Sequence, residues 1–353
     1  MSLINDNLHY NKKLKKNYIM IVELTYLIIL NFFIGFNYKV IASKLNIYDT
    51  PDKFRKFHQE NVPLLGGLIL ILNLTFIVLY NIFAKSNYLG KSIFLVYNYS
   101  LISFLLCPIL IFLIGLYDDK YNIEPTKKLF FTAFIVLIAI FSDPNININT
   151  LKFISFESEI SLGKLNIIFT LLCILIFMNA FNMLDGINIL AGLYSILFLL
   201  IIFSLKVMDP LILLLFTPLI LFLYLNLKNK IFLGDSGSLL LGYLISIIVI
   251  FSYNANKEFY SEEILILMLF PGLEIIRLSC TRLINGLHPF EPDRNHLHHL
   301  LLLKFNQINT ILIIFLLIIS PIFLFYFIKL EILICIALGI IMYMYSLIFL
   351  KKK

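Results

Sequence analysis

Residues 238–254 read SLLLGYLISIIVIFSYN, an apolar stretch without a single charged side chain. A helix needs about 20 mostly apolar residues to cross the roughly 30 Å hydrocarbon core of a bilayer. Continuous apolar runs do not fit the alternating pattern of a transmembrane barrel strand. The stretch therefore predicts a membrane-spanning helix, and similar stretches recur along the chain.

The composition points the same way. The chain has 353 residues, of which 60% are hydrophobic and 14% are charged, whereas a soluble domain has about 45–50% apolar and about 25% charged residues. This excludes a soluble enzyme, a disordered chain and a secreted disulfide scaffold. The four cysteines lie within or at the ends of apolar runs without zinc-ligand spacing, so we expect reduced, inert thiols.

We expect an all-α, polytopic integral-membrane helical bundle with ten or eleven transmembrane helices. No linker or internal repeat divides the chain, so we expect an N-terminal tail at 1–17 and one transmembrane domain at 18–353. The predicted spans are 18–37, 64–84, 97–116, 129–142, 165–181, 189–206, 211–226, 238–254, 263–283, 308–328 and 331–350.

Lysine and arginine set the expected orientation. With alternate loops assigned to one side, that side carries seventeen of these residues and the other side seven, which places the first side in the cytoplasm. The cluster Lys12, Lys13, Lys15 and Lys16 disagrees, because an odd number of spans puts it outside. Since the positive charge lies in short loops, we expect the bilayer, and no nucleic acid, as its partner.

Five polar segments lie at helix ends on the positive side, and the first two combine basic and acidic groups. In 49–67, basic side chains are able to hold phosphates and paired glycines allow close approach to a helix start; a plain positive-inside loop is the alternative. In 115–128, two adjacent carboxylates repel each other unless a cation or a shared proton intervenes; a solvated helix cap is the alternative. The residues are Asp49, Arg55, Lys56, His58, Asp118, Asp119 and Lys128.

The third and fourth segments carry hard oxygen ligands. Asn179, Asn182, Asp185 and Asn188 lie between apolar runs, where polar side chains are costly unless they face a cavity. Asp235 lies between glycines at the predicted start of a helix. Both sets suit Mg²⁺; interhelical hydrogen bonding and an N-cap turn are the respective alternatives.

The fifth segment, 289–299, contains Arg294, His296, His298 and His299. It has no cysteine or further carboxylate at zinc spacing, so phosphate binding and orientation fit better than a transition metal. Together the five segments place metal ligands, phosphate ligands and helix starts on one face of one membrane, which is what phosphoryl transfer at an interface requires.

The five segments, in this order from Asp49 to His299, resemble the polyprenyl-phosphate N-acetylhexosamine-1-phosphate transferases, glycosyltransferase family 4. Within it, FRKFHQ with VPLLGG and PFEPDRNHLHH resemble the bacterial branch that uses undecaprenyl phosphate and UDP-N-acetylglucosamine. The resemblance implies an enzyme that makes undecaprenyl-diphospho-sugar and UMP with Mg²⁺, or Mn²⁺ in its place. It would catalyse the first membrane step of a cell-envelope polysaccharide such as O-antigen, at the cytoplasmic face of a bacterial inner membrane.

The resemblance also implies roles for individual residues. Asp235, with Asn182, would bind the metal; Asp118 and Asp119 would supply the base, or the nucleophile of a covalent intermediate. The catalytic group would also include Asp185, near the nucleotide, and Lys128, in the phosphate site. The substrate-binding residues would be Asp49, Arg55, Lys56, His58, Asn179, Asn188, Arg294, His296, His298 and His299.

Three positions depart from the family pattern. Ile189 stands where Gly is usual, His288 where Ser is usual, and Glu274 where Asp is usual. The first two lie beside the nucleotide and sugar segments, so they leave the identity of the sugar open.

Other functions remain as alternatives. The runner-up is a phospho-N-acetylmuramoyl-pentapeptide transferase or a transferase for another UDP-N-acetyl sugar, and a homodimer stays open. A membrane transporter is the competing class, but it predicts charges near the bilayer midplane and symmetric halves. Here the acids lie at span ends on one side; only Glu23 and Glu274 lie well inside apolar runs, Glu23 near an interface and Glu274 one turn from Arg277.

Overall fold

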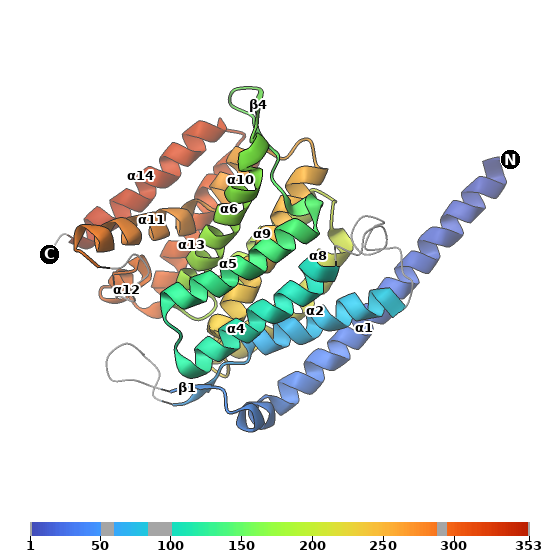
Figure 1. Cartoon of the computed structure of the whole chain (residues 1–353), viewed down its shortest axis with the longest axis horizontal. Coiled ribbons are helices and arrows are strands. Elements are labelled where there is room, and N and C mark those ends of the chain that lie inside the picture. Colours follow the sequence, from blue (N-terminus) through green and yellow to red (C-terminus); the bar gives the residue numbers. More distant parts are fainter. Residues whose placement is uncertain (1, 51–59, 84–100, 288–294, 352–353) are drawn as a thin grey trace.

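The protein is a helical bundle with two short β-hairpins (Figure 1). The computed structural model describes residues 2–50, 60–83, 101–287 and 295–351. The α-helices are α1 (Ser2–Leu45), α2 (Gly66–Phe83), α4 (Cys107–Tyr121), α5 (Pro125–Ser142), α6 (Asn166–Leu184), α7 (Leu190–Ser204), α8 (Asp209–Leu227), α9 (Gly234–Ala255), α10 (Ser261–Leu267), α11 (Leu269–Ile284), α12 (Leu297–Leu302), α13 (Gln307–Tyr326) and α14 (Ile332–Lys351). The short helical turns are η1 (Ile102–Leu106), η2 (Pro144–Ile146) and η3 (Gly163–Leu165).

The expected polytopic helical class is confirmed. Within the described ranges, eight helices are long and apolar enough to cross a membrane, and a ninth span results if the bent pair α10 and α11 is counted as one. The expected ranges 64–84 and 189–206 correspond to the shorter apolar helices α2 and α7. Helix α1 already begins at Ser2, so residues expected in the N-terminal tail continue that helix.

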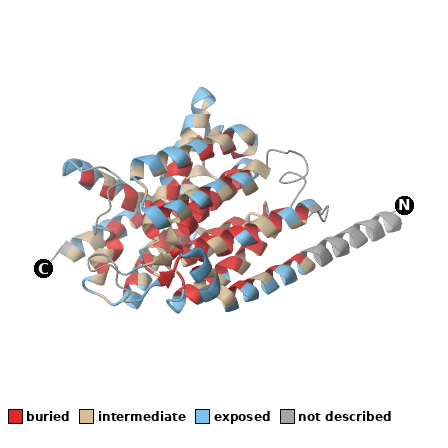
Figure 2. Ribbon diagram, turned by 60° about the horizontal axis from the view of Figure 1, so that its bottom comes forward, coloured by how far each residue is buried: buried red, intermediate tan, exposed pale blue. Residues whose placement is uncertain are grey.

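Helix α9 forms the centre of the bundle. Every residue from Ser236 to Tyr253 is buried, and α9 packs against α2, α4, α6 and α7. Small residues allow this close packing: a Cβ on Gly115 would lie 2.4 Å from Ser236 Cα, and one on Gly242 would lie 2.9 Å from Met178 Cα. Figure 2 shows buried residues along the interior faces and exposed residues outside, as expected for helices that face lipid.

The chain bends sharply between α10 and α11, by 71°. Pro271, in the first turn of α11, has no N–H to donate to the carbonyl four residues earlier, so one backbone hydrogen bond is missing at the bend. At the α10 side, Glu263 accepts a hydrogen bond from Tyr326 Oη at 2.8 Å, and Glu262 accepts two from the backbone after β3 (Thr150–Phe153). Strand β3 pairs antiparallel with β4 (Ser158–Ser161).

The hairpin of β1 (Tyr48–Asp49) and β2 (Val62–Pro63) connects the first polar segment, 49–67, to the fourth, which contains Asp235. The two strands pair antiparallel. Phe232 N then donates to Pro63 O at 2.9 Å, and Gly66 N donates to Phe232 O at 3.0 Å. The start of α2 is therefore held beside the residues that lead into α9.

Candidate active site

Asp118 and Lys128 come together through the turn between α4 and α5. Asn122 ends α4 in the left-handed region, and Pro125 begins α5, a favourable first helical position for proline. This turn brings the two side chains, ten residues apart, into contact, with Lys128 Nζ 2.7 Å from Asp118 Oδ2. Asp118 is buried, and its Oδ1 accepts the backbone N–H of Ile123 at 2.6 Å.

Lys128 also reaches the fourth segment. Its Nζ lies 3.2 Å from Asp235 Oδ2, so one ammonium group bridges two carboxylates from α4 and α9. Only 18% of the Lys128 side chain is exposed. An ion pair this shielded is screened less than a surface pair, and Lys128 therefore offsets much of the repulsion between the two acids.

Asp119 points to a different partner from Asp118. Its Oδ1 accepts the backbone N–H of Asp235 at 2.7 Å, and its Oδ2 accepts that of Ser236 at 3.1 Å. These are free N–H groups at the start of α9, where negative charge is favourable. Gly234 has φ +73, and a Cβ there would lie 2.8 Å from Asp119 Oδ2, so glycine is needed for this contact.

Asn182, near the end of α6, completes the group around Asp235. Its Nδ2 donates to Asp235 Oδ1 at 2.5 Å and to Ser238 Oγ at 2.7 Å. Neither bond uses the amide oxygen. Asn179 does not join this group through its amide nitrogen, which donates to Leu175 O of its own helix at 2.7 Å.

Asp185 follows directly after α6. Burial and the charges of Asp235 and Asp119 raise the pKa of Asp185 to about 8. These interactions place Asp185 within electrostatic reach of the acidic group. Asn188, in contrast, donates to Asn229 in the loop before α9.

Ile189 adopts φ +79, a backbone conformation that is costly for a β-branched residue. This is the position where the family pattern has glycine. Its N–H donates to Asn226 Oδ1 at 2.6 Å, and Asn226 Nδ2 donates to Ile231 O at 2.8 Å. Asn226 is buried, and it joins the third segment to the residues that precede the fourth.

The histidines gather on α12 and at its start. The ring centroids of His298 and His299 are 4.2 Å apart, and those of His296 and His298 are 5.2 Å apart. His298 lies against the third segment, because a Cβ on Gly186 would be only 2.1 Å from His298 Nε2. Burial, followed by the neighbouring histidines, lowers the pKa of His298 well below its usual value, so His298 is neutral at neutral pH.

The remaining predicted residues belong to the first and fifth segments. Asp49 lies on β1, paired with Val62. The other four expected substrate-binding residues and His288 lie outside the described ranges; they are Arg55, Lys56, His58, Arg294 and His288.

A metal site must draw on few protein ligands. Among the residues that the structure describes, no three His, Cys, Asp or Glu side chains form a metal-binding group. Asp235 nevertheless supplies carboxylate oxygens, and the amide oxygen of Asn182 is not used in the two hydrogen bonds that its nitrogen donates to Asp235 and Ser238. Mg²⁺ in enzymes often takes one or two carboxylates together with water and substrate phosphates. The donor chemistry of these two residues fits Mg²⁺.

Sequence reasoning missed several supporting residues. Ser238 and Asn226 make contacts 56 and 37 residues away along the chain. Glu274 stands out in the sequence as a departure from the family pattern, but its contact with the N–H of Leu297, 23 residues away, was not predicted. The only signal in the sequence for these residues is their position within or next to apolar runs. That position indicates a buried polar group but does not identify its partner.

The fold and the site define a multi-pass membrane protein that gathers acidic, amide and basic side chains where its helices end. The profile of glycosyl transferase family 4 matches residues 101–253. The undecaprenyl-phosphate alpha-N-acetylglucosaminyl 1-phosphate transferase of Thermotoga maritima is 30% identical over 287 residues, covering 81% of this chain and 83% of that protein. Proteins of the same name are 27% identical in Salmonella typhi and 28% identical in Escherichia coli K12, each covering 74% of this chain and 71% of the relative.

The chain belongs to glycosyl transferase family 4. It is an enzyme of the polyprenyl-phosphate sugar-1-phosphate transferase type, as the motifs predicted.

Proposed function

We propose that this enzyme transfers N-acetylglucosamine 1-phosphate from UDP-N-acetylglucosamine to undecaprenyl phosphate, with release of UMP. The reaction would take place at the cytoplasmic face of a bacterial inner membrane. The relatives are named for this acceptor and this sugar phosphate. The observation that carries the proposal is the bridge from Asp118 through Lys128 to Asp235 and Asn182, because it combines charge-offsetting and metal-binding groups at helix ends.

The reaction brings two anions together. An oxygen of the lipid phosphate attacks the phosphorus next to the sugar, the bond to the UMP oxygen breaks, and UMP leaves. There is little for the protein to do except hold the phosphates in line and offset their charge. A bound Mg²⁺ would supply charge stabilisation and orientation for the phosphates.

The chain's own residues divide this work. We assign Asp235 and the amide oxygen of Asn182 to the metal. Lys128 offsets charge beside the phosphates. Asp118 is the better candidate for the base, since both oxygens of Asp119 already accept backbone N–H groups of α9.

Asp185 and the histidine segment form the donor side. Asp185 lies near the acidic group, and His298 packs on Gly186 next to it. A neutral imidazole is able to donate one hydrogen bond to a diphosphate oxygen without adding charge. We assign His298, with His296, His299 and Arg294, to the UDP-sugar.

A donor panel tests the sugar. Purified protein in detergent is incubated with undecaprenyl phosphate, Mg²⁺ and one UDP-sugar at a time, and the lipid product is identified by mass spectrometry. The panel contains UDP-N-acetylglucosamine, UDP-N-acetylgalactosamine and UDP-N-acetylmuramoyl-pentapeptide. The proposal expects undecaprenyl-diphospho-N-acetylglucosamine as the main product; a clear preference for another donor would overturn the sugar assignment.

A further inference from the structure

Glu274 is a buried acid on α11, outside the acidic group described above, with 6% of its surface exposed. Its Oε1 accepts the backbone N–H of Leu297 at 2.7 Å and Arg277 Nη2 at 2.8 Å. Its Oε2 accepts the hydroxyl of Tyr343 on α14. The carboxylate thus connects α11 and α14 to the first residue of α12.

Arg277 binds the backbone before α12 at a second position. Its Nη2 donates to Asn295 O at 2.7 Å, and its Nε donates to Tyr343 Oη at 2.8 Å. The group of Glu274, Arg277 and Tyr343 therefore fixes the backbone at two positions, Asn295 O and Leu297 N. Hydrogen bonds with a charged partner are about twice as strong as neutral ones, so this group is a firm anchor.

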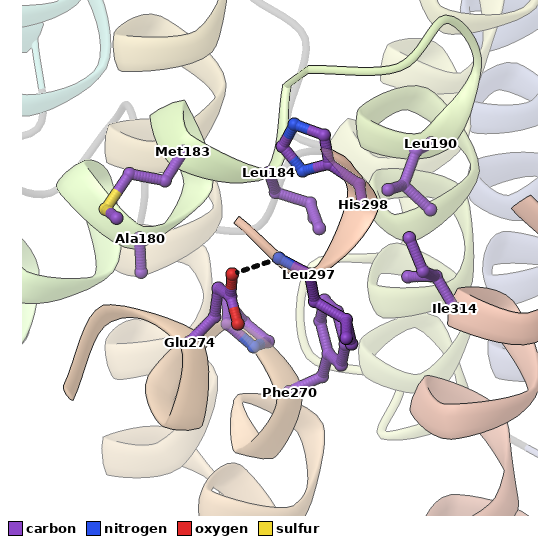
Figure 3. A pocket seen from close by; sticks show the side chains of 10 residues that line it. Ala180, Met183, Leu184, Leu190, Phe270, Glu274, Leu297, His298 and Ile314 are labelled. Carbon is purple, nitrogen blue, oxygen red and sulfur yellow. Dashed lines mark hydrogen bonds between the residues drawn. The ribbon is translucent and has the colours of Figure 1, made fainter. Parts of the chain in front are cut away.

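The anchored backbone leads directly to His298. Figure 3 shows the carboxylate of Glu274 bonded to Leu297 N, with the His298 ring beyond Leu297, near Leu184. His298 is 6% exposed, and among the described residues its Nε2 has no hydrogen-bond partner. A buried polar atom without a partner is costly. Within the described part of the chain, His298 Nε2 therefore remains an unpaired hydrogen-bonding group beside Gly186, and it is the group that we assign to the UDP-sugar.

We propose that Glu274, with Arg277 and Tyr343, is a positioning group that fixes the Asn295–Leu297 backbone and so sets His298 against Gly186 for the UDP-sugar. The proposal rests on the proposed function for the identity of the donor. It also gives the acid at this position a role: its carboxylate contacts Leu297 N, Arg277 and Tyr343 at once.

Hydrogen–deuterium exchange tests the anchoring without any assay of turnover. We expect the Tyr343→Phe and Glu274→Gln variants to exchange the amides of residues 297–303 about tenfold faster than the wild type, because a hydrogen bond to the anchor is weakened. Tyr343→Phe removes a single hydroxyl, so it still reports if Glu274→Gln fails to fold. Unchanged exchange over 297–303 in folded Tyr343→Phe would overturn the proposal.

Kinetics test the consequence for the donor. We expect the KM for UDP-N-acetylglucosamine to rise about tenfold in Tyr343→Phe, while kcat and the KM for undecaprenyl phosphate change less than about threefold. A fall in kcat with an unchanged donor KM would contradict a positioning role. If the wild type itself releases no UMP, the proposed function fails, whereas the exchange experiment still decides the anchoring.

Tyr326→Phe is the matched control. Tyr326 donates to Glu263 at 2.8 Å, the same chemical pair, but Glu263 lies on α10, whose main contacts are with α14, α13, β3 and α11. It should lower the melting temperature to a similar extent without changing exchange at 297–303 or the donor KM. If both tyrosine variants changed the donor KM equally, the Glu274 group would contribute only to general stability. That result would overturn the proposal.

Discussion

The carboxylate of Asp119 holds the backbone that carries Asp235. Its two oxygens accept the N–H groups of Asp235 and Ser236, at 2.7 Å and 3.1 Å. Its neighbour Asp118 instead faces Lys128. The adjacent acids, which look equivalent in sequence, therefore do different work: one supports the start of α9, and the other lies beside the cation.

We expect Asp119→Asn to lower the free energy of unfolding by about 1–3 kcal/mol, because the amide nitrogen cannot accept one of the two N–H groups. Turnover should fall at least about tenfold, since Asp235 loses its support. Denaturant unfolding and UMP release measure the two effects. Asp143→Ala, which removes the side-chain cap of η2, should cost stability without lowering turnover; unchanged stability in Asp119→Asn would contradict the assignment.

Lys128→Met should leave Asp118 and Asp235 facing each other without a cation. We expect a loss of about 2 kcal/mol or more in the free energy of unfolding, because removing one partner of a shielded pair leaves an uncompensated charge. Adding Asp118→Asn should restore part of that stability but no turnover. A double variant as unstable as Lys128→Met would contradict the bridge.

Ile189→Gly should stabilise the protein. The residue has φ +79, and relief of that conformation is worth about 1–2 kcal/mol, less the entropy that glycine adds to the unfolded chain. We expect a small rise in the melting temperature, measured in detergent. Ile187→Gly, at a buried neighbour without positive φ, should lower it; a loss of stability in Ile189→Gly would show that its side-chain packing outweighs the strain.

Asp185 should make the metal-free protein less stable as the pH rises. Its pKa is raised to about 8 from the usual value of 3.8, so between these two pH values the folded state holds a proton that the unfolded state has lost. The contribution is fully present below about pH 4 and is lost as the pH rises through about 8. Melting temperatures in EDTA between pH 5 and 9 measure this decline.

Asp185→Asn should remove that part of the pH dependence, and Mg²⁺ should reduce it in the wild type, because a nearby cation favours the carboxylate. A melting temperature with the same pH dependence in the wild type and Asp185→Asn would contradict the pKa assignment.

The sequence was sufficient for the membrane class, and it predicts the polar segments from which the candidate site is built. Apolar runs predict the helices because lipid demands them, and the rare charges at their ends reveal the polar face. The hydrogen-bond and ion-pair partners of individual residues could not be predicted from the sequence. Lys128 pairs with Asp235 over a separation of 107 residues, and the different roles of Asp118 and Asp119 depend on the direction in which each side chain points at the end of α4.

The same limit explains the anchor at α12. Glu274 and Arg277 lie three positions apart on one helix, so their ion pair can be predicted from the sequence. Tyr343, however, lies 69 residues beyond Glu274 in an apolar run. Nothing in a local pattern joins it to them, because the contact depends on how α14 packs on α11.

The most direct test of the account is UMP release by the purified wild type and the Asp235→Asn variant, with Mg²⁺, undecaprenyl phosphate and UDP-N-acetylglucosamine. We predict that release by the wild type requires the lipid and stops with EDTA, and that folded Asp235→Asn releases no UMP. Full activity of Asp235→Asn, or no lipid-dependent release from folded wild type, would contradict the account.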